Sequence, residues 1–308
     1  MVAGTEKMNQ SKDLLLKSLR AVLFGEKLDA SAFAEADWKS IFQLADEQTV
    51  SALLLDGMSL LPSECIAIPL GDKLKRIATM QRIEQTNCLH RKVIGKIDHA
   101  LKSEGIPVVF MKGQTTALRY PNPLYRTPGD IDFVVNPKDF KKTMEVLEKI
   151  GKVDHDLVHE HHGMAWVDGV TVEPHYKVHN YQCPSTDHAM QEMFTSVLPS
   201  ELYSADMDGY AVPVFPPTFE SVFLISHMVN HVYEEGLGLR QVIDYAMFLS
   251  SCADKIDWLQ HHDYLHRMHM ERAWRIFTCI CVDYLGMPLP SQAVSYTHLR
   301  AHETRHDL

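Results

Sequence analysis

The chain of 308 residues lacks any apolar run close to the roughly 20 residues that a membrane-spanning helix needs. Its first residues, MVAGTEKMNQSKDLLLKSL, are too polar for a secretory signal. The six cysteines include no CxxC pair, which argues against a disulfide framework and against a cysteine zinc site. We therefore expect a globular, cytoplasmic protein that is not attached to a membrane, and the 45% hydrophobic content can fill a sizeable core.

A surplus of positive charge is also missing, because the formal net charge is −10. Only the segment 96–150 is basic, with nine basic against seven acidic side chains. An acidic chain is a poor candidate for gripping long nucleic acid through its phosphates. A local basic site could still hold a small anion, so small phosphorylated ligands fit the charge distribution better.

The hydrophobic pattern divides the chain into four regions. Apolar residues recur at helical spacing over 1–95 and again over 216–290. Between them, 96–215 contains short β-rich runs, and a helical pattern separates the second run from the third. The runs are IPVVFMK, DIDFVV and VTVEPHYKV, and the helical segment is PKDFKKTMEVLEKIG. We predict an α/β core between two helical regions.

The last segment, 291–308, does not match the rest of the chain. It follows a clean stop at GMPLPSQ and has no helical or strand periodicity. Its histidines, His298, His302 and His306, have a spacing that could bind a metal on a helix. An extraneous tail is the favoured interpretation, and we exclude it from the predicted fold.

Two aspartates begin the second β-rich run. Side chains alternate faces along a strand, so Asp130 and Asp132 point to one side while Ile131 and Phe133 point into the core. Like charges this close are costly unless a cation lies between them, and Mg²⁺ prefers such hard oxygen ligands. The alternative is a solvated strand start, with an Asx turn after Gly129.

A strand-to-helix turn precedes these aspartates. The run IPVVFMK leads into Lys112, Gly113 and Gln114 and then into the helical TTALRY. Glycine at such a turn lets the backbone approach a ligand, and N–H groups at a helix start attract phosphate. The turn is a candidate phosphate cradle, although Lys112 could also be a solvated edge residue.

The third β-rich run adds a carboxylate. In GVTVEPHYKV, Glu173 and His175 share the polar face, opposite the valines. If this strand lies beside the Asp130–Asp132 strand, Glu173 becomes a third carboxylate of one site, while Pro174 indicates an edge or strand end. An exposed strand residue and a partly buried, hydrogen-bonded ring are the alternatives for Glu173 and His175.

The His-rich stretch HDLVHEHHG suggests zinc at first sight. It lacks the HExxH order of metalloproteases and lies in a segment expected to be a loop between helix and strand. We therefore favour a solvated loop over a zinc site. The histidines concerned are His155, His159, His161 and His162.

The C-terminal region contains two pairs at i, i+4 spacing. His227 with His231, and Arg240 with Asp244, each share a helix face. A satisfied interhelical contact and a surface ion pair are the favoured interpretations. A role in binding the acceptor substrate remains possible for the four residues and for His175.

The order of these features resembles a known superfamily. The segments MKGQTTALRYPNPLYRTPGDIDFVV, VTVEPH and LRQVIDYAMFL, within about 105–250, are similar to nucleotidyltransferases of the DNA polymerase beta type. They resemble in particular a family of uncharacterised bacterial nucleotidyltransferases. The resemblance implies an α+β fold, with a small mixed sheet and flanking helices. One departure is Gly113-Gln114, where the superfamily usually has Gly-Ser or Gly-Gly.

The resemblance also implies a reaction. A nucleoside monophosphate would pass from an NTP, such as ATP, to an acceptor hydroxyl on a small molecule or a protein, and pyrophosphate would leave. Asp130 and Asp132 would hold two Mg²⁺ ions, and Glu173 would anchor the second ion or act as base. Candidate nucleotide-binding residues are Lys112, Gly113, Gln114, Arg126 and Gly129. Arg126 could instead pair with Asp130.

Two other functions remain open. A phosphatase of the haloacid dehalogenase type also uses DxD, but its aspartates follow an apolar strand. In this chain a polar loop precedes them and FVV follows, which argues against that enzyme. The chain could also be a catalytically inactive nucleotide-binding or partner-binding module, as Gln114 permits. Because all three carboxylate positions are acidic, we favour an active transferase.

Overall fold

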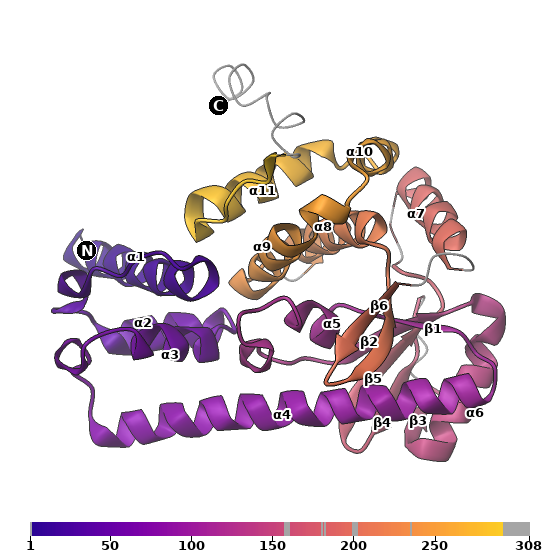
Figure 1. Cartoon of the computed structure of the whole chain (residues 1–308), viewed down its shortest axis with the longest axis horizontal. Coiled ribbons are helices and arrows are strands. Elements are labelled where there is room, and N and C mark those ends of the chain that lie inside the picture. The colour runs from indigo at the N-terminus through magenta and orange to yellow at the C-terminus, as the bar shows by residue number, and fades with distance from the viewer. Residues whose placement is uncertain are drawn as a thin grey trace.

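In a computed structural model, helices form both ends of the chain, and the strands lie in its middle part together with shorter helices (Figure 1). The structure describes residues 2–156, 161–179, 181, 183–198, 203–234 and 236–291, so His159 and residues 292–308 of the expected tail lie outside it. The α-helices are α1 (Val2–Phe24), α2 (Trp38–Glu47), α3 (Ser51–Ser59), α4 (Leu70–Ser103), α5 (Gly113–Ala117), α6 (Phe140–Ile150), α7 (Pro184–Val197), α8 (Pro217–Glu234), α9 (Leu239–Cys252), α10 (Trp258–Arg267) and α11 (Glu271–Leu285). The strands are β1 (Val108–Met111), β2 (Ile131–Val135), β3 (Lys152–Asp154), β4 (Met164–Val167), β5 (Val170–His175), β6 (Tyr203–Met207) and β7 (Tyr210–Val214).

The main sheet is mixed, with the strand order β1-β2-β5-β4-β3. β2 pairs antiparallel with β1 and parallel with β5, and the remaining neighbours are antiparallel. β6 and β7 form a separate antiparallel pair. This is the α+β architecture that we expected, and β1, β2, β5 and α6 are the elements that the hydrophobic pattern predicted.

Two hairpins were not predicted. Asp168-Gly169 joins β4 to β5, and Asp208-Gly209 joins β6 to β7. All four residues have positive φ angles of 50°, 81°, 57° and 85° in chain order, as two-residue turns between antiparallel strands require. Asp-Gly between β-rich runs is a known hairpin signal, so the sequence did contain the information.

The two faces of the sheet pack against different helices. Ile131, Phe133 and Val135 point toward α4 and α6, in a core that includes Val93 and Leu147. Val134, one residue out of phase, belongs to the core formed with the C-terminal helices. Figure 1 shows α4 on one side of the sheet and α8 and α9 on the other. Asp132 therefore faces the C-terminal helices.

The helix α4 is amphipathic only in part. Val93, Ile97 and Leu101, in its C-terminal half, are buried against the sheet, as the periodicity predicts. Leu74 and Ile77, on its N-terminal half, are 59% and 53% exposed because the helix extends past the sheet. Periodicity shows which residues share a face, whereas burial also requires a neighbouring element.

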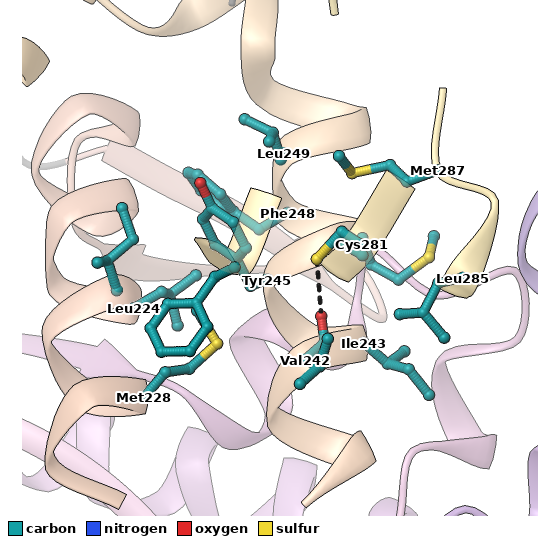
Figure 2. Close-up of a cluster of buried hydrophobic side chains, with 14 of the residues drawn as sticks. Leu224, Met228, Val242, Ile243, Tyr245, Phe248, Leu249, Cys281, Leu285 and Met287 are labelled. Atoms are coloured by element: carbon teal, nitrogen blue, oxygen red, sulfur yellow. Dashed lines mark hydrogen bonds between the residues drawn. The ribbon is translucent and has the colours of Figure 1, made fainter. Parts of the chain in front are cut away.

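The N-terminal and C-terminal helices share one large apolar core. In Figure 2, α8, α9 and α11 meet through residues such as Met228, Phe248 and Leu285, and the Cys281 thiol donates to the Val242 carbonyl at 3.7 Å. α1 packs against these C-terminal helices, and the guanidinium of Arg20 on α1 donates to the carbonyl of Tyr284 on α11 at 2.8 Å. None of the described helices combines the length and the apolar character needed to cross a bilayer.

Phe133 provides a test of the sheet core. Its side chain is fully buried, and its ring centroid lies 5.6 Å from that of Phe110. We expect Phe133→Ala to lower the free energy of unfolding by about 3–5 kcal/mol, because a large cavity forms in a packed interior. Denaturant unfolding measures this, with Tyr233→Ala, at an 84% exposed side chain, as the control. Similar losses in the two variants would contradict this packing.

Candidate active site

The two aspartates and Glu173 are brought together by the pairing of β2 with β5. Asp132 lies opposite Glu173 in the parallel register, and Asp130 directly precedes β2. Because partners in parallel strands point to the same face, the carboxylates converge. All three line a cavity of about 730 Å³ between the sheet and the helices α8 and α9.

Asp132 is a buried anion with two partners. The Lys112 ammonium donates to Asp132 Oδ1 at 3.1 Å, and His175 Nε2 lies 3.0 Å from the same oxygen. Burial opposes ionisation, but the charge of Lys112 and the hydrogen bond with His175 hold the pKa of Asp132 well below its usual range. His175, expected on the acceptor side, thus lies among the carboxylates.

The pKa of Glu173 is shifted in the opposite direction from that of Asp132. Burial, together with the charges of Asp132 and Asp130, raises the pKa of Glu173 to about 8, although Lys112 opposes this. In metal-free buffer at neutral pH, Glu173 therefore holds its proton. Asp132, Glu173 and His175 each offer a donor atom within 4.8 Å of the others, which is a group that could hold a metal ion.

The turn after β1 directs Lys112 at this group. Lys112 has φ 56° and ψ −153°, a conformation that residues other than glycine rarely adopt. Gly113 follows with φ 43°, and a Cβ there would lie 3.4 Å from the Asp130 carbonyl oxygen. Lys112 stays protonated because Asp132 and Asp130 raise its pKa despite the lowering effect of burial. Both residues of the turn, and Gly129, line the cavity as expected.

Gln114 is placed differently from the expectation. Its side chain is buried outside the cavity, where its Nε2 donates to Asn87 Oδ1 at 2.6 Å and its Oε1 accepts from Arg91 Nε at 3.4 Å. The carbonyl of the fully buried Asn87 on α4 needs a donor, and Gln114 supplies it. The side chain of Gln114 is therefore committed to Asn87 and Arg91, and a role of Gln114 in nucleotide binding stays a prediction that only its backbone could fulfil.

The arginines also differ from the expectation. Arg126 was expected to bind phosphate or to pair with Asp130. Its guanidinium instead donates to both carboxylate oxygens of Asp244 at 2.8 Å. Asp244 also accepts from the Tyr120 hydroxyl at 2.6 Å. The expected surface ion pair of Arg240 with Asp244 is wrong, since Asp244 is buried and faces Arg126. Arg240 lines the cavity, near Gly129.

His227 and His231 form part of the opposite wall. Their Nε2 atoms lie 3.1 Å apart, and both rings line the cavity. Burial and the nearby charge of Lys112 keep the pKa of His227 well below its usual value, so its ring is neutral at neutral pH. Both rings belong to α8 and contact each other. The expectation of a contact between two helices is therefore wrong for this pair.

The solvated loop predicted for the His-rich stretch is wrong for two of its members. His155 is exposed, as expected, but His161 and His162 line the cavity. His162 Nε2 lies 3.7 Å from Glu173 Oε2. The reason is an unpredicted backbone pairing, in which His162 forms an antiparallel bridge with His175 at the end of β5.

Several cavity residues were missed. On α8, Asn230 and Glu234 follow His227 at i+3 and i+7, so they share its helix face, and this spacing was an available signal. His179 and Gln241 also line the cavity, and no motif in the sequence indicates them.

A family model of uncharacterised nucleotidyltransferases matches residues 34–286, which is most of the chain. The chain belongs to this family. The match confirms the resemblance seen in the sequence and makes the protein a nucleotidyltransferase by family. No curated protein matches the chain.

Solved nucleotidyltransferase structures are similar to this nucleotidyltransferase only distantly. The antibiotic-resistance factor ANT(2'')-Ia in solution has a TM-score of 0.41 at 14% identity, covering 60% of this chain and 97% of that chain. Its crystal structure with adenylyl-2''-tobramycin has a TM-score of 0.41 at 14% identity, with coverages of 58% and 98%. An antigenic nucleotidyltransferase-like protein from Paracoccidioides brasiliensis has a TM-score of 0.37 at 15% identity, with coverages of 60% and 91%.

Breaking the buried ion pair tests the wall of the cavity. Asp244→Asn leaves the Arg126 guanidinium buried without its counter-charge, so we expect a loss of about 3–5 kcal/mol in unfolding free energy. Asp168→Asn is the matched control, because Asp168 pairs with Lys96 at 2.8 Å on the surface. There we expect less than about 1 kcal/mol. Equal effects in urea unfolding would show that the Arg126 pair is not desolvated.

The raised pKa of Glu173 predicts a pH dependence in metal-free buffer. The folded protein holds this proton up to about pH 8, whereas an ordinary glutamate releases it near 4.5, so stability falls as the pH rises between these values. Glu173→Gln removes the ionisation. We expect the variant to exceed the wild type by roughly 2–4 kcal/mol at pH 8.5 and to gain nothing from this effect at pH 4.

Thermal or denaturant unfolding over this pH range measures the difference. Glu148→Gln, at a 60% exposed side chain, controls for the loss of one glutamate. A constant difference between Glu173→Gln and the wild type at all pH values would refute the electrostatic explanation.

Proposed function

We propose that this nucleotidyltransferase moves a nucleoside monophosphate from an NTP to an acceptor hydroxyl, in a reaction that depends on Mg²⁺. The observation that carries the proposal is the convergence of Asp130, Asp132 and Glu173 in one cavity. Its volume of about 730 Å³ lies within the range of about 300–1,000 Å³ typical of small-molecule sites. This favours an NTP with a small-molecule acceptor over a protein acceptor.

The donor atoms fit a hard divalent cation. Asp130, Asp132 and Glu173 face one space, and the charges of the two aspartates add to burial in raising the pKa of Glu173, an effect that a bound cation would offset. Asp130 and Asp132 would hold two Mg²⁺ ions, and Glu173 would anchor the second. When bound, the ions supply positive charge to the triphosphate and lower the pKa of the acceptor hydroxyl.

The side chains of this chain supply the remaining requirements. The acceptor oxygen forms a bond to the α-phosphorus, the bond from that phosphorus to the α,β-bridging oxygen breaks, and pyrophosphate leaves. Where Glu173 does not ligate the second ion, it would accept the hydroxyl proton as general base. Glu173 lies on the rigid strand β5, which positions it for this transfer.

Lys112 and Arg240 are the cations proposed for the phosphates. The Lys112 ammonium lies beside Asp132, where the triphosphate would approach the carboxylates. Arg240 lines the cavity, and its Nε is buried without a hydrogen-bond partner. An unsatisfied buried guanidinium N–H is a ready donor to an anion. Arg126 is committed to Asp244, so its proposed role is to position α9.

The face of α8 is the proposed acceptor side. His227, Asn230, His231 and Glu234 present rings, an amide and a carboxylate toward the cavity. Hydrogen-bonding groups of this kind suit a polar molecule that carries hydroxyls. The carboxylates lie on the sheet, across the cavity from this face, so the reacting oxygen would lie between the two walls.

Incorporation of label from an α-labelled NTP tests the activity. The wild type should transfer label in the presence of Mg²⁺, onto an acceptor from a metabolite extract. We expect Asp130→Asn to reduce the rate by at least about 100-fold and Asp130→Asn with Asp132→Asn to abolish it, because the reaction then lacks its positioned charge.

A second DxD of the same chain supplies the matched control. Asp206 and Asp208 flank Met207 at the exposed β6–β7 turn, away from the cavity. Asp208 accepts from Arg91 at 2.6 Å outside the cavity, so Asp206→Asn with Asp208→Asn should lose this ion pair and leave transfer unchanged. Circular dichroism confirms that each variant is folded. Transfer retained in the Asp130 and Asp132 double variant would refute the site, and NTP binding without transfer would support an inactive binding module.

A further inference from the structure

Histidines are concentrated in the cavity beyond what the carboxylate chemistry requires. Among the histidines that the structure describes, six line it, on two opposite walls. They are His161, His162, His175 and His179 near the sheet, and His227 and His231 on α8. Nucleotidyl transfer with Mg²⁺ needs oxygen donors, so the reaction proposed above leaves most of these imidazoles without a role.

The histidines next to the sheet are held by backbone hydrogen bonds. His162 bridges to His175, and the Gly163 N–H donates to the Pro174 carbonyl at 2.9 Å. The Tyr176 N–H donates to the His161 carbonyl at 3.0 Å. These bonds continue the antiparallel pairing of β4 with β5, so the segment that carries His161 and His162 is fixed to the strand that carries Glu173 and His175.

The three rings face one another. The ring centroids of His161 and His162 lie 4.4 Å apart, those of His162 and His175 5.0 Å, and those of His161 and His175 5.5 Å. One nitrogen from each ring lies within 4.8 Å of the others. A zinc tetrahedron with bonds of about 2.0–2.1 Å has edges of ~3.4 Å. Small side-chain rotations would therefore bring the nitrogens to coordinating positions.

A fourth donor is already close. Glu173 Oε2 lies 3.7 Å from His162 Nε2 and 3.8 Å from His175 Nε2, near the edge length of such a tetrahedron. His175 Nε2 also lies 3.0 Å from Asp132 Oδ1, and an ion bound at this nitrogen would replace that contact. Behind His161, the His179 ring lies at 5.2 Å and is itself packed on Tyr181 at 4.9 Å. This support limits the movement of His161.

We propose that His161, His162, His175 and Glu173 form a binding site for a zinc-class transition-metal ion beside the carboxylates. Imidazole nitrogen binds Zn²⁺ and Co²⁺ in preference to Mg²⁺, whereas the three carboxylates alone favour Mg²⁺. The two sites share Glu173. An ion held by the histidines therefore also binds Glu173, which the transfer reaction requires. Zn²⁺ bound there inhibits nucleotidyl transfer because it competes with Mg²⁺ for Glu173.

Binding of Co²⁺ and Zn²⁺ in the presence of excess Mg²⁺ tests the site without any need for activity. For the wild type we expect one Co²⁺ ion per chain with the intense visible absorption of a tetrahedral complex, and its displacement by Zn²⁺. His161→Ala with His162→Ala should weaken binding by more than about 100-fold, because loss of even an outer partner of a metal ligand costs about 10–100-fold.

Three variants make the result specific. His155→Ala removes an exposed histidine of the same segment and should bind like the wild type. His161→Gln with His162→Gln keeps polar side chains of similar size and should still lose the ion, which separates loss of ligands from loss of folding. Asp130→Asn should keep Co²⁺ although it lowers the rate of transfer, so this test and the test of the proposed function can fail separately.

Two outcomes would overturn the proposal. One is a wild-type protein that takes up neither Co²⁺ nor Zn²⁺ when Mg²⁺ is in excess. The other is a folded His161→Gln, His162→Gln variant that binds with wild-type affinity, which would assign the ion to other residues.

Discussion

The parallel pairing of β2 with β5 is the constraint on which the site depends. It sets Asp132 opposite Glu173 on one face, so two like charges are held together where water is partly excluded. Lys112 and His175 stabilise the charge of Asp132, whereas the pKa of Glu173 remains raised to about 8. The apolar face of the same two strands packs on α4 and α6. This burial stabilises an arrangement that electrostatics alone would oppose.

A second buried interaction determines the opposite wall of the cavity. Arg126 lies shortly before β2, and Asp244 lies on α9, so their bidentate ion pair connects the aspartate strand to the C-terminal helices. A buried ion pair contributes little net stability, because desolvation offsets its attraction. Its directional hydrogen bonds nevertheless restrict how α9 can lie, and they leave Arg240 facing the cavity. The position of α9 and the orientation of Arg240 toward the cavity thus share one cause.

Much of the fold could be predicted from the sequence, and so could the three carboxylates of the candidate site. Strand alternation placed Asp130 and Asp132 on one face, and the polar face of β5 placed Glu173 with them once the strands were taken as neighbours. The hairpin β4–β5 was missed although Asp168-Gly169 signals it. His162 was missed with it, because the two-residue turn pairs Val167 with Val170 and the same register, continued, places His162 opposite His175.

The sequence by itself determined which side chains share a face of a strand or helix, because that depends only on local backbone geometry. It therefore determined the DxD pair and the histidines of α8. Only the tertiary structure decided the partners: Gln114 with Asn87, Arg126 with Asp244, and Glu173 with His162. These contacts join segments far apart in the chain. Their distances are decided by how the sheet packs against helices on both of its faces, which no local pattern specifies.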